Sequence, residues 1–141
     1  MIKYCIDVCP YDAILLKDWF GDTTTSKRIC VVTCPTLPLR FADPLTKLCA
    51  TSCPPNYVSD PISSICANGC PSGYFAYEPD RKCVIKCPNG YFGDNTVGIR
   101  KCYNSSALCG TKFGDPYLNL CVTTCTGPSP VSLFGSGDDC V

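Results

Sequence analysis

Seven close pairs of cysteines recur along the chain and constrain its fold more than any other feature. The first cysteines of successive pairs are 17 to 25 residues apart. Self-similarity at a short, nearly fixed period is typical of an array of small repeats, each contacting mainly its neighbours. We therefore expect one continuous array over residues 1–141, with repeats starting near residues 5, 30, 49, 66, 83, 102 and 121 and a partial repeat at 140. The pairs are Cys5/Cys9, Cys30/Cys34, Cys49/Cys53, Cys66/Cys70, Cys83/Cys87, Cys102/Cys109 and Cys121/Cys125.

The cysteine content indicates the cellular compartment. Fifteen of 141 residues are cysteine, a density typical of disulfide scaffolds and rarely maintained in a reducing cytosol. The alternative is a set of zinc sites, but structural zinc sites favour a Cys-x2-Cys spacing and often include histidine. This chain repeats Cys-x3-Cys and contains no histidine. We therefore expect a secreted protein, extracellular or at the cell surface, whose cysteines form disulfide bonds and hold no metal.

Charge and hydropathy exclude several classes of protein. Twelve acidic and twelve basic residues are interspersed, so no basic stripe favours nucleic acid, and a neutral surface permits association between copies. No apolar run reaches the roughly 18 residues that span a bilayer, so no membrane span is expected. The residues before Cys5 leave no room for a signal peptide, and Cys140 begins a repeat that is not completed. We therefore expect a processed form or a segment of a longer chain.

A second pattern emerges when the repeats are aligned on their cysteines. Proline often follows the second cysteine, and an aromatic residue, a small residue and an aspartate come later, as in Phe41-Ala42-Asp43 and Phe92-Gly93-Asp94. Proline suits the entry of a strand, the aromatic residue supplies buried area, and the aspartate forms a turn. We interpret Tyr57-Val58-Ser59-Asp60 as a stretched version of the same pattern. Each repeat therefore predicts a short, irregular β-hairpin closed near its base by cysteine.

Hairpin geometry favours one disulfide connectivity, in which the second cysteine of each pair bonds to the first cysteine of the next pair. A rival scheme of overlapping bonds, first to third and second to fourth, stays open because sequence alone does not determine connectivity. Each repeat has only one or two aromatic residues, so we expect a small disulfide-rich repeat array, an elongated rod of irregular β-hairpin modules with little helix and no common core. The favoured bonds are Cys9–Cys30, Cys34–Cys49, Cys53–Cys66, Cys70–Cys83, Cys87–Cys102, Cys109–Cys121 and Cys125–Cys140.

Two hexapeptides carry a resemblance to a known type of repeat. Residues 70–75 (Cys-Pro-Ser-Gly-Tyr-Phe) and 87–92 (Cys-Pro-Asn-Gly-Tyr-Phe) resemble the Cys-Pro-x-Gly-Tyr-Phe core of furin-like and growth-factor-receptor cysteine-rich repeats. Residues 41–49 and 113–116 are similar to the tandem repeats of protist surface proteins, especially ciliate ones. The resemblance implies extracellular rods of single-disulfide modules without catalytic residues. The regular Cys-x3-Cys spacing departs from the mixed spacing of the receptor repeats, which weakens any inference of growth-factor binding.

The first long loop is the least regular part of the array. It contains the densest apolar cluster of the chain, which is either a small local core or a docking patch for another copy. Such an end-located patch would make heterologous contacts, which generate rings or filaments. Cys5 has no partner in the favoured scheme and is expected to be unpaired or bonded to another chain. The candidate contact residues are Ile14, Leu15, Leu16, Trp19 and Phe20.

Glycans are the expected modification. Asn104-Ser105-Ser106 is a sequon for N-glycosylation and lies where the spacing between Cys102 and Cys109 is widened. Candidate positions for O-glycans are the hydroxyl residues 23–26 and Ser129, which lies between two prolines. The turn aspartates offer one acid per repeat, whereas calcium needs six to eight converging oxygens, so we expect these aspartates to cap turns and no cofactor to be bound.

Without histidine, the chain lacks the imidazole base of Ser-His and Cys-His catalysis, and it contains no phosphate-binding loop, so we expect no enzyme. The leading hypothesis is a non-catalytic extracellular structural protein whose repeats associate end to end with copies of themselves into a filament, coat or surface appendage. The alternative is a stalk or binding module of a cell-surface receptor or adhesin. A third reading is an accessory domain beside an enzyme.

Overall fold

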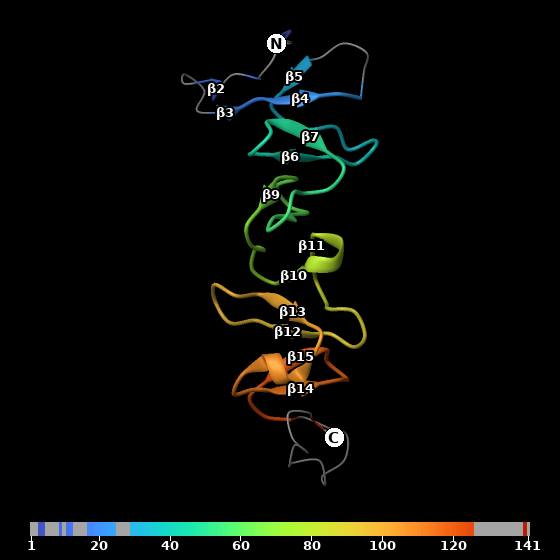
Figure 1. The fold of residues 1–141 in the computed structure, drawn as a ribbon, viewed down its shortest axis with the longest axis vertical. Coiled ribbons are helices and arrows are strands. Elements are labelled where there is room, and N and C mark those ends of the chain that lie inside the picture. Colours follow the sequence, from blue (N-terminus) through green and yellow to red (C-terminus); the bar gives the residue numbers. More distant parts are fainter. Residues whose placement is uncertain are drawn as a thin grey trace. The chain divides into compact units, whose positions relative to one another are not determined.

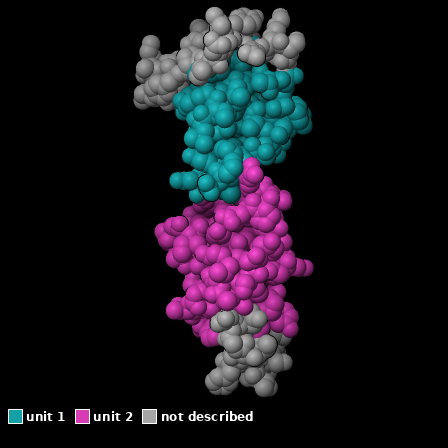
Figure 2. Space-filling model, in the orientation of Figure 1, with its two compact units in different colours: residues 1–68 teal, residues 69–141 magenta. Residues whose placement is uncertain are grey.

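The computed structural model describes residues 3–4, 9, 11–12, 17–24, 29–125 and 140. The chain divides into two compact units, residues 1–68 and residues 69–141 (Figure 2). Each unit is described by itself. In the described part of the chain, no helix is both long and apolar enough to cross a membrane.

Both units consist of short β-strands (Figure 1). Unit 1 contains β1 (Lys3–Tyr4), β2 (Tyr11–Asp12), β3 (Lys17–Asp18), β4 (Phe20–Asp22), β5 (Ile29–Val31), β6 (Phe41–Asp43), β7 (Leu48–Ala50), β8 (Val58–Ser59) and β9 (Cys66–Ala67). Unit 2 contains β10 (Phe75–Tyr77), β11 (Lys82–Val84), β12 (Phe92–Asp94), β13 (Lys101–Tyr103), β14 (Phe113–Asp115) and β15 (Leu120–Val122). Two short 3₁₀ helices, η1 (Glu78–Asp80) and η2 (Ser106–Cys109), lie in unit 2, and the described residues form no α-helix.

The first six disulfides along the chain each join the entry of a hairpin to its second strand, as predicted. All seven bonds have the favoured connectivity, and the Cα atoms of each bonded pair are 5.5–5.7 Å apart, which is ordinary disulfide geometry. The rival overlapping scheme is therefore wrong. We call the segments enclosed by the bonds modules 1 to 7: residues 9–30, 34–49, 53–66, 70–83, 87–102, 109–121 and 125–140.

Within a hairpin, the small residue of the recurring pattern lies opposite the second cysteine of the bond. Gly93 pairs with Cys102 in the antiparallel pair β12–β13, and Gly114 pairs with Cys121 in β14–β15. The aspartate after the small residue then begins the turn. Asp43 Oδ1 accepts the backbone N–H of the residue two positions later at 2.9 Å, and equivalent bonds form at the other turn aspartates. The expectation that these aspartates cap turns is confirmed.

Two modules depart from the recurring order of an aromatic residue, a small residue and an aspartate. Val58 pairs with Ala67 and Ser59 pairs with Cys66, so Val58 stands at the aromatic position and module 3 has the ordinary register. Our interpretation of this segment as a stretched repeat is wrong, because the valine, and not Tyr57, occupies that position. In module 4, Tyr77 stands where other modules have aspartate, and η1 replaces the aspartate-capped turn.

Neighbouring hairpins within a unit are joined by parallel strand contacts. In unit 1, Gly21 of β4 lies beside Leu48 of β7. In unit 2, β10 contacts β13 and β12 contacts β15 in the same manner (Figure 1). In each of these contacts, the first strand of one hairpin lies beside the second strand of the next hairpin along the chain. The buried apolar residues form separate small clusters, each built around a disulfide.

Candidate functional site

The repeated feature of this structure is the junction between neighbouring modules, and the aromatic residue forms its apolar part. Phe75 of module 4 is buried against Cys87 and Cys102, the disulfide of module 5. Phe20 of module 1 packs in the same way against the disulfide of module 2 and against Ala42. A disulfide offers a compact apolar surface, so each of these two rings covers the disulfide bond of the next module and shields it from water.

The small residue provides the space for that ring. A Cβ atom placed on Gly93 would lie 2.9 Å from the Phe75 ring and 3.1 Å from Cys87 Sγ. At Gly114, a Cβ atom would lie 2.8 Å from the Phe92 ring of the preceding module. The two distances to a phenylalanine ring are shorter than normal packing allows. The Phe-Gly-Asp pattern therefore has three roles, because the phenylalanine covers the next module, the glycine accepts the preceding ring and the aspartate closes the turn.

Backbone hydrogen bonds form the polar part of the junction. The N–H group of the small residue donates to a carbonyl of the next module, with N···O distances of 2.7 Å at Gly21, 2.9 Å at Ala42, 2.8 Å at Ala76 and 2.8 Å at Gly93. Between modules 6 and 7 the small residue accepts instead, because Cys140 donates its N–H to the carbonyl of Gly114 at 2.9 Å. The acceptor residues, in the same order, are Lys47, Ser64, Arg100 and Asn119.

Each of these four acceptors lies two positions before a cysteine and has a left-handed backbone conformation. Their φ angles are 56°, 57°, 38° and 56°. A non-glycine residue with positive φ is uncommon and costs free energy, so the surrounding hydrogen bonds must maintain the conformation. The left-handed residue ends the hairpin turn and directs its carbonyl at the preceding module. We call these four residues the turn acceptors.

Side chains of the turn acceptors also bind the preceding module. Arg100 Nη1 donates to the carbonyl of Cys70 at 3.3 Å, and Asn119 Nδ2 donates to the carbonyl of Cys87 at 2.9 Å. Lys47 Nζ forms an ion pair with Asp18 at 2.9 Å. Asn119 is buried, so its amide satisfies a carbonyl that burial would otherwise leave without water.

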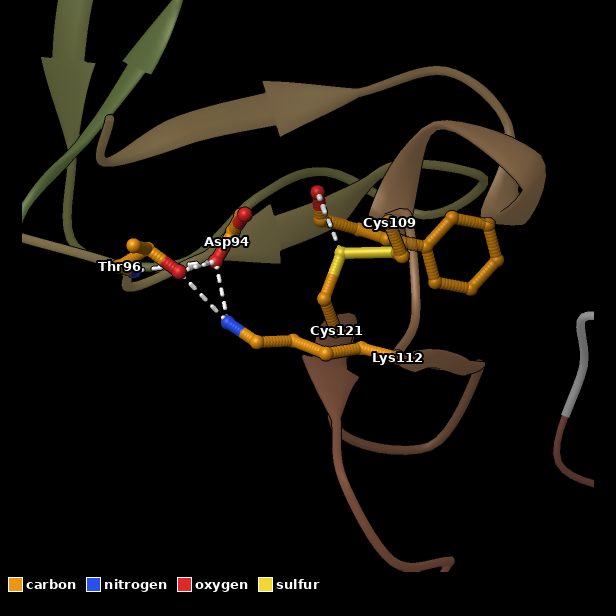
Figure 3. Close-up of polar contacts among 6 residues, drawn as sticks. Asp94, Thr96, Cys109, Lys112 and Cys121 are labelled. Carbon is orange, nitrogen blue, oxygen red and sulfur yellow. Dashed lines mark hydrogen bonds and ion pairs between the residues drawn. A yellow bond between two sulfur atoms is a disulfide. The ribbon is translucent and has the colours of Figure 1, made fainter.

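An ion pair adds a charged contact between modules 5 and 6. Lys112 Nζ lies 2.6 Å from Asp94 Oδ1 and 2.7 Å from Thr96 Oγ1 (Figure 3). Burial raises the pKa of Asp94, but hydrogen bonds from Lys112 and Thr96 outweigh it, and the pKa of this carboxyl is lowered overall. The disulfide Cys109–Cys121 of module 6 also approaches module 5, because Cys121 Sγ lies 4.0 Å from the carbonyl oxygen of Phe92 (Figure 3). Both partners of the ion pair are largely shielded from solvent, so salt and bulk water screen their attraction less than that of a surface pair.

The structure places only part of the candidate contact patch. Trp19 is buried against the Cys9–Cys30 disulfide, and Phe20 is buried against that of module 2. These two residues therefore belong to small local cores, and the docking interpretation fails for them because neither side chain is exposed. Ile14, Leu15, Leu16 and Cys5 lie outside the described residues.

The predicted modification sites fall in exposed segments. Asn104 follows β13 and is exposed, and Thr23 and Thr24 are exposed after β4. Thr24 also donates its hydroxyl to Asp22 Oδ1 at 2.7 Å, so it takes part in the turn cap. The other predicted O-glycan positions, residues 25–26 and Ser129, lie outside the described residues.

The turn acceptors were missed at the sequence level. They include lysine, serine, arginine and asparagine, so no residue type marks them. The usable signal is their constant distance from the next cysteine, together with the turn aspartate shortly before. Among the residues that the structure describes, no group of three or more histidine, cysteine, aspartate or glutamate side chains is arranged to hold a metal ion.

Comparison of the chain with protein-family models, curated proteins and solved structures found no match. The structure itself defines the class: a small disulfide-rich β-hairpin protein with seven regularly spaced, sequence-local disulfides. So many disulfides indicate an oxidising environment, such as the secretory pathway or the extracellular space.

Proposed function

We propose that this chain is a non-catalytic structural protein of the cell exterior whose modules associate end to end, copy to copy, into a filament, coat or surface appendage. An N-linked glycan on Asn104 belongs to this proposal. The observation that carries it is the junction itself, which has two different and complementary faces. One face presents an aromatic ring, and the other presents a small residue beside a disulfide.

Such a junction has a direction. The ring of one module fits the next module and not a second copy of its own face, so the contact is heterologous. A heterologous contact whose rotation does not close generates an open filament. The backbone ladder, formed through N–H and C=O groups, does not depend on side-chain identity. Copies of the chain could therefore extend the same contacts that already join neighbouring modules within each unit.

Electron microscopy and analytical ultracentrifugation of the oxidised, glycosylated protein test this proposal. We expect polymers that lengthen with protein concentration. A second form of the chain, fused at one end to a bulky folded domain, serves as a terminator. Because the contact is heterologous, adding this form in small amounts should shorten the polymers. Monomers at all concentrations up to high micromolar would contradict the proposal.

A specific observation supports the second candidate, a stalk or binding module of a surface receptor or adhesin. In module 1, Trp19 covers the disulfide of its own module, as Phe75 covers that of module 5. Strand β1 also pairs antiparallel with β5, unlike the parallel contacts between modules. Both features differ from the repeated junction that joins neighbouring modules. The same sedimentation experiment separates the two candidates, because a stalk stays monomeric.

A further inference from the structure

A hollow of about 510 Å³ lies on unit 2, where modules 4 and 5 meet the segment between modules 5 and 6. Its volume falls within the roughly 300–1,000 Å³ typical of small-molecule sites. It is lined by residues of η1, β13 and η2, and by the loop that precedes β12. The lining residues that the argument uses are Glu78, Tyr91, Lys101, Tyr103, Asn104 and Leu108.

The lining combines aromatic and charged groups. Tyr91 is held by an edge-to-face contact with Tyr77, with ring centroids 5.1 Å apart. Lys101 Nζ forms an ion pair with Glu78 at 2.7 Å and lies 5.8 Å from the centre of the Tyr103 ring. Tyrosine rings present apolar faces and hydroxyl groups together, and the ion pair offers both a donor and an acceptor. This is the chemistry that binds the apolar C–H face and the hydroxyl groups of a sugar.

The sequon supplies a sugar at this place. Asn104 lines the hollow and is exposed, and it follows Tyr103 directly. Ser105 then has an extended backbone, with φ −152° and ψ 140°, before η2 begins. The acceptor asparagine therefore lies in an accessible loop between modules 5 and 6, beside the two tyrosines. A sugar attached to its amide starts at the edge of the hollow.

We propose that the first N-acetylglucosamine of a glycan on Asn104 packs into this hollow against Tyr91 and Tyr103. The inference rests on the glycosylation proposed above. In that step Asn104 Nδ2 forms a bond to C1 of the sugar and loses one proton, while the bond from C1 to a lipid-linked pyrophosphate donor breaks and the lipid pyrophosphate leaves. The packed sugar then contacts residues of modules 4 and 5 together with Leu108 of η2.

Covalent attachment makes this packing favourable. Leu108 is 54 % exposed, so its apolar side chain has surface to bury beneath the sugar. A free monosaccharide would lose translational entropy on binding, whereas a tethered sugar is already at high effective concentration. The sugar would hold η2 against β13. Its effect on hydrogen exchange should therefore be local, and greatest in the segment from Tyr103 to Cys109.

Trimming the glycan tests the packing. The protein from a eukaryotic secretory host is compared in three forms: intact, cut by an endoglycosidase to one N-acetylglucosamine, and stripped by an amidase, which converts the glycosylated asparagine to aspartate. We expect hydrogen exchange of Tyr103 to Cys109 to be equal in the first two forms. It should be about two- to tenfold faster in the third, the range of one aromatic stacking contact. Equal exchange in all three forms would overturn the packing.

Two variants control for charge and for glycans in general. Asn104→Gln removes the glycan without adding a charge and should reproduce the stripped form. Adding Val97→Thr to it creates a new Asn-Thr-Thr sequon that starts at Asn95 in an exposed turn, because Val97 is 85 % exposed. A glycan on Asn95 should not slow hydrogen exchange at residues 103–109. Slower exchange there would contradict specific packing of the Asn104 sugar in the hollow.

Tyr103→Ser distinguishes the ring from the sugar. If the sugar packs on Tyr103, glycan removal should change exchange much less in this variant than in the natural chain, and an unchanged glycan effect would overturn the role of Tyr103. Intact mass spectrometry reports occupancy separately. An unoccupied Asn104 would overturn this inference while leaving end-to-end association untouched, because the polymer measurement does not depend on the glycan seat.

Discussion

Gly93 shows how one residue can be determined by two modules. Its backbone pairs with Cys102 in its own hairpin, and its missing side chain leaves room for Phe75 of the module before. Ala42 occupies the same position in module 2, where Phe20 packs against it. The position therefore tolerates a small side chain only where the neighbouring ring leaves space. Residue identity here follows from the contact between modules and not from strand propensity.

Gly93→Ala should destabilise unit 2, because the new methyl group would displace Phe75 from the disulfide surface. Overpacking of this kind costs about 1–3 kcal/mol. Urea unfolding of the oxidised protein, followed by circular dichroism, measures the change. The matched control is Gly69→Ala, because no atom lies within 4 Å of a Cβ placed there. Equal midpoints for the two variants would show that the ring moves aside freely.

The ion pair of Asp94 with Lys112 should make stability depend on pH. The pKa of Asp94 is lowered in the folded state, so its contribution is present above the unfolded value of roughly 3.9 and is lost as the pH falls through the folded value. At neutral pH, Lys112→Met should lower stability by about 1–3 kcal/mol, because a shielded carboxylate loses its partner.

Unfolding measured from pH 7 down to strongly acidic conditions checks this. The difference between wild type and Lys112→Met should shrink as Asp94 becomes protonated. Lys86→Met is the control, because Lys86 is exposed and its contact with the Tyr117 carbonyl is long, at 3.5 Å. A difference that is the same at every pH would contradict an electrostatic role for Lys112.

At the scale of the hairpin, the sequence predicts what is local. The cysteines of one bond are 12 to 21 residues apart, so the short loop between them leaves few alternatives for pairing. The turn aspartates accept hydrogen bonds from backbone N–H groups two residues later. This interaction lies within one repeat, so the sequence of that repeat is enough to predict it. The register of module 3 was not predictable in this way, because Tyr57 and Val58 are both apolar and either suits the buried position.

The junctions lay beyond prediction for a physical reason. The function of a turn acceptor depends on the direction of its backbone carbonyl. Many residue types can adopt the required left-handed conformation when hydrogen bonds maintain it, so the residue type does not identify the position. Asn119 is the exception in part, since asparagine tolerates positive φ better than most residues. The apolar contacts of the junctions were also not predictable from the sequence. Trp19 and Phe20 are adjacent in the sequence and suggest one apolar patch, but the two rings cover disulfides of different modules.

Asn119 should separate the two roles of a turn acceptor. Asn119→Gly keeps the left-handed backbone and removes the amide that binds the Cys87 carbonyl, which costs about 0.5–1.5 kcal/mol. Asn119→Ala removes the amide and also disfavours positive φ, which adds roughly 1 kcal/mol. The expected order of urea midpoints is wild type, glycine, then alanine. If alanine equals glycine, the backbone conformation is not what the position requires.

At the scale of the whole molecule, disulfide bonds stabilise the fold in place of a shared hydrophobic core. The described apolar clusters each include cysteines of a disulfide, so the bonds are at once covalent links and buried surface. Closing a loop of about 15 residues restricts the unfolded chain by about 3 kcal/mol in the entropy model. Breaking a bond therefore removes a constraint on the unfolded state and a surface for the neighbouring ring, and both effects act in the same direction.

Reduction should consequently unfold every described module, whereas metal removal should not. We expect a thiol reductant at neutral pH to abolish the strand signal in circular dichroism and to collapse the amide dispersion in NMR spectra. A chelator without reductant should leave both unchanged. Alkylation after partial reduction, followed by peptide mapping, would show which bond opens first. We expect the bonds of modules 1, 2 and 5 to be protected relative to Cys70–Cys83, because Trp19, Phe20 and Phe75 cover them, whereas Cys70 is only partly buried. Persistent structure after complete reduction, or unfolding by the chelator, would mean that the sulfurs do not hold this fold together by bonding to one another.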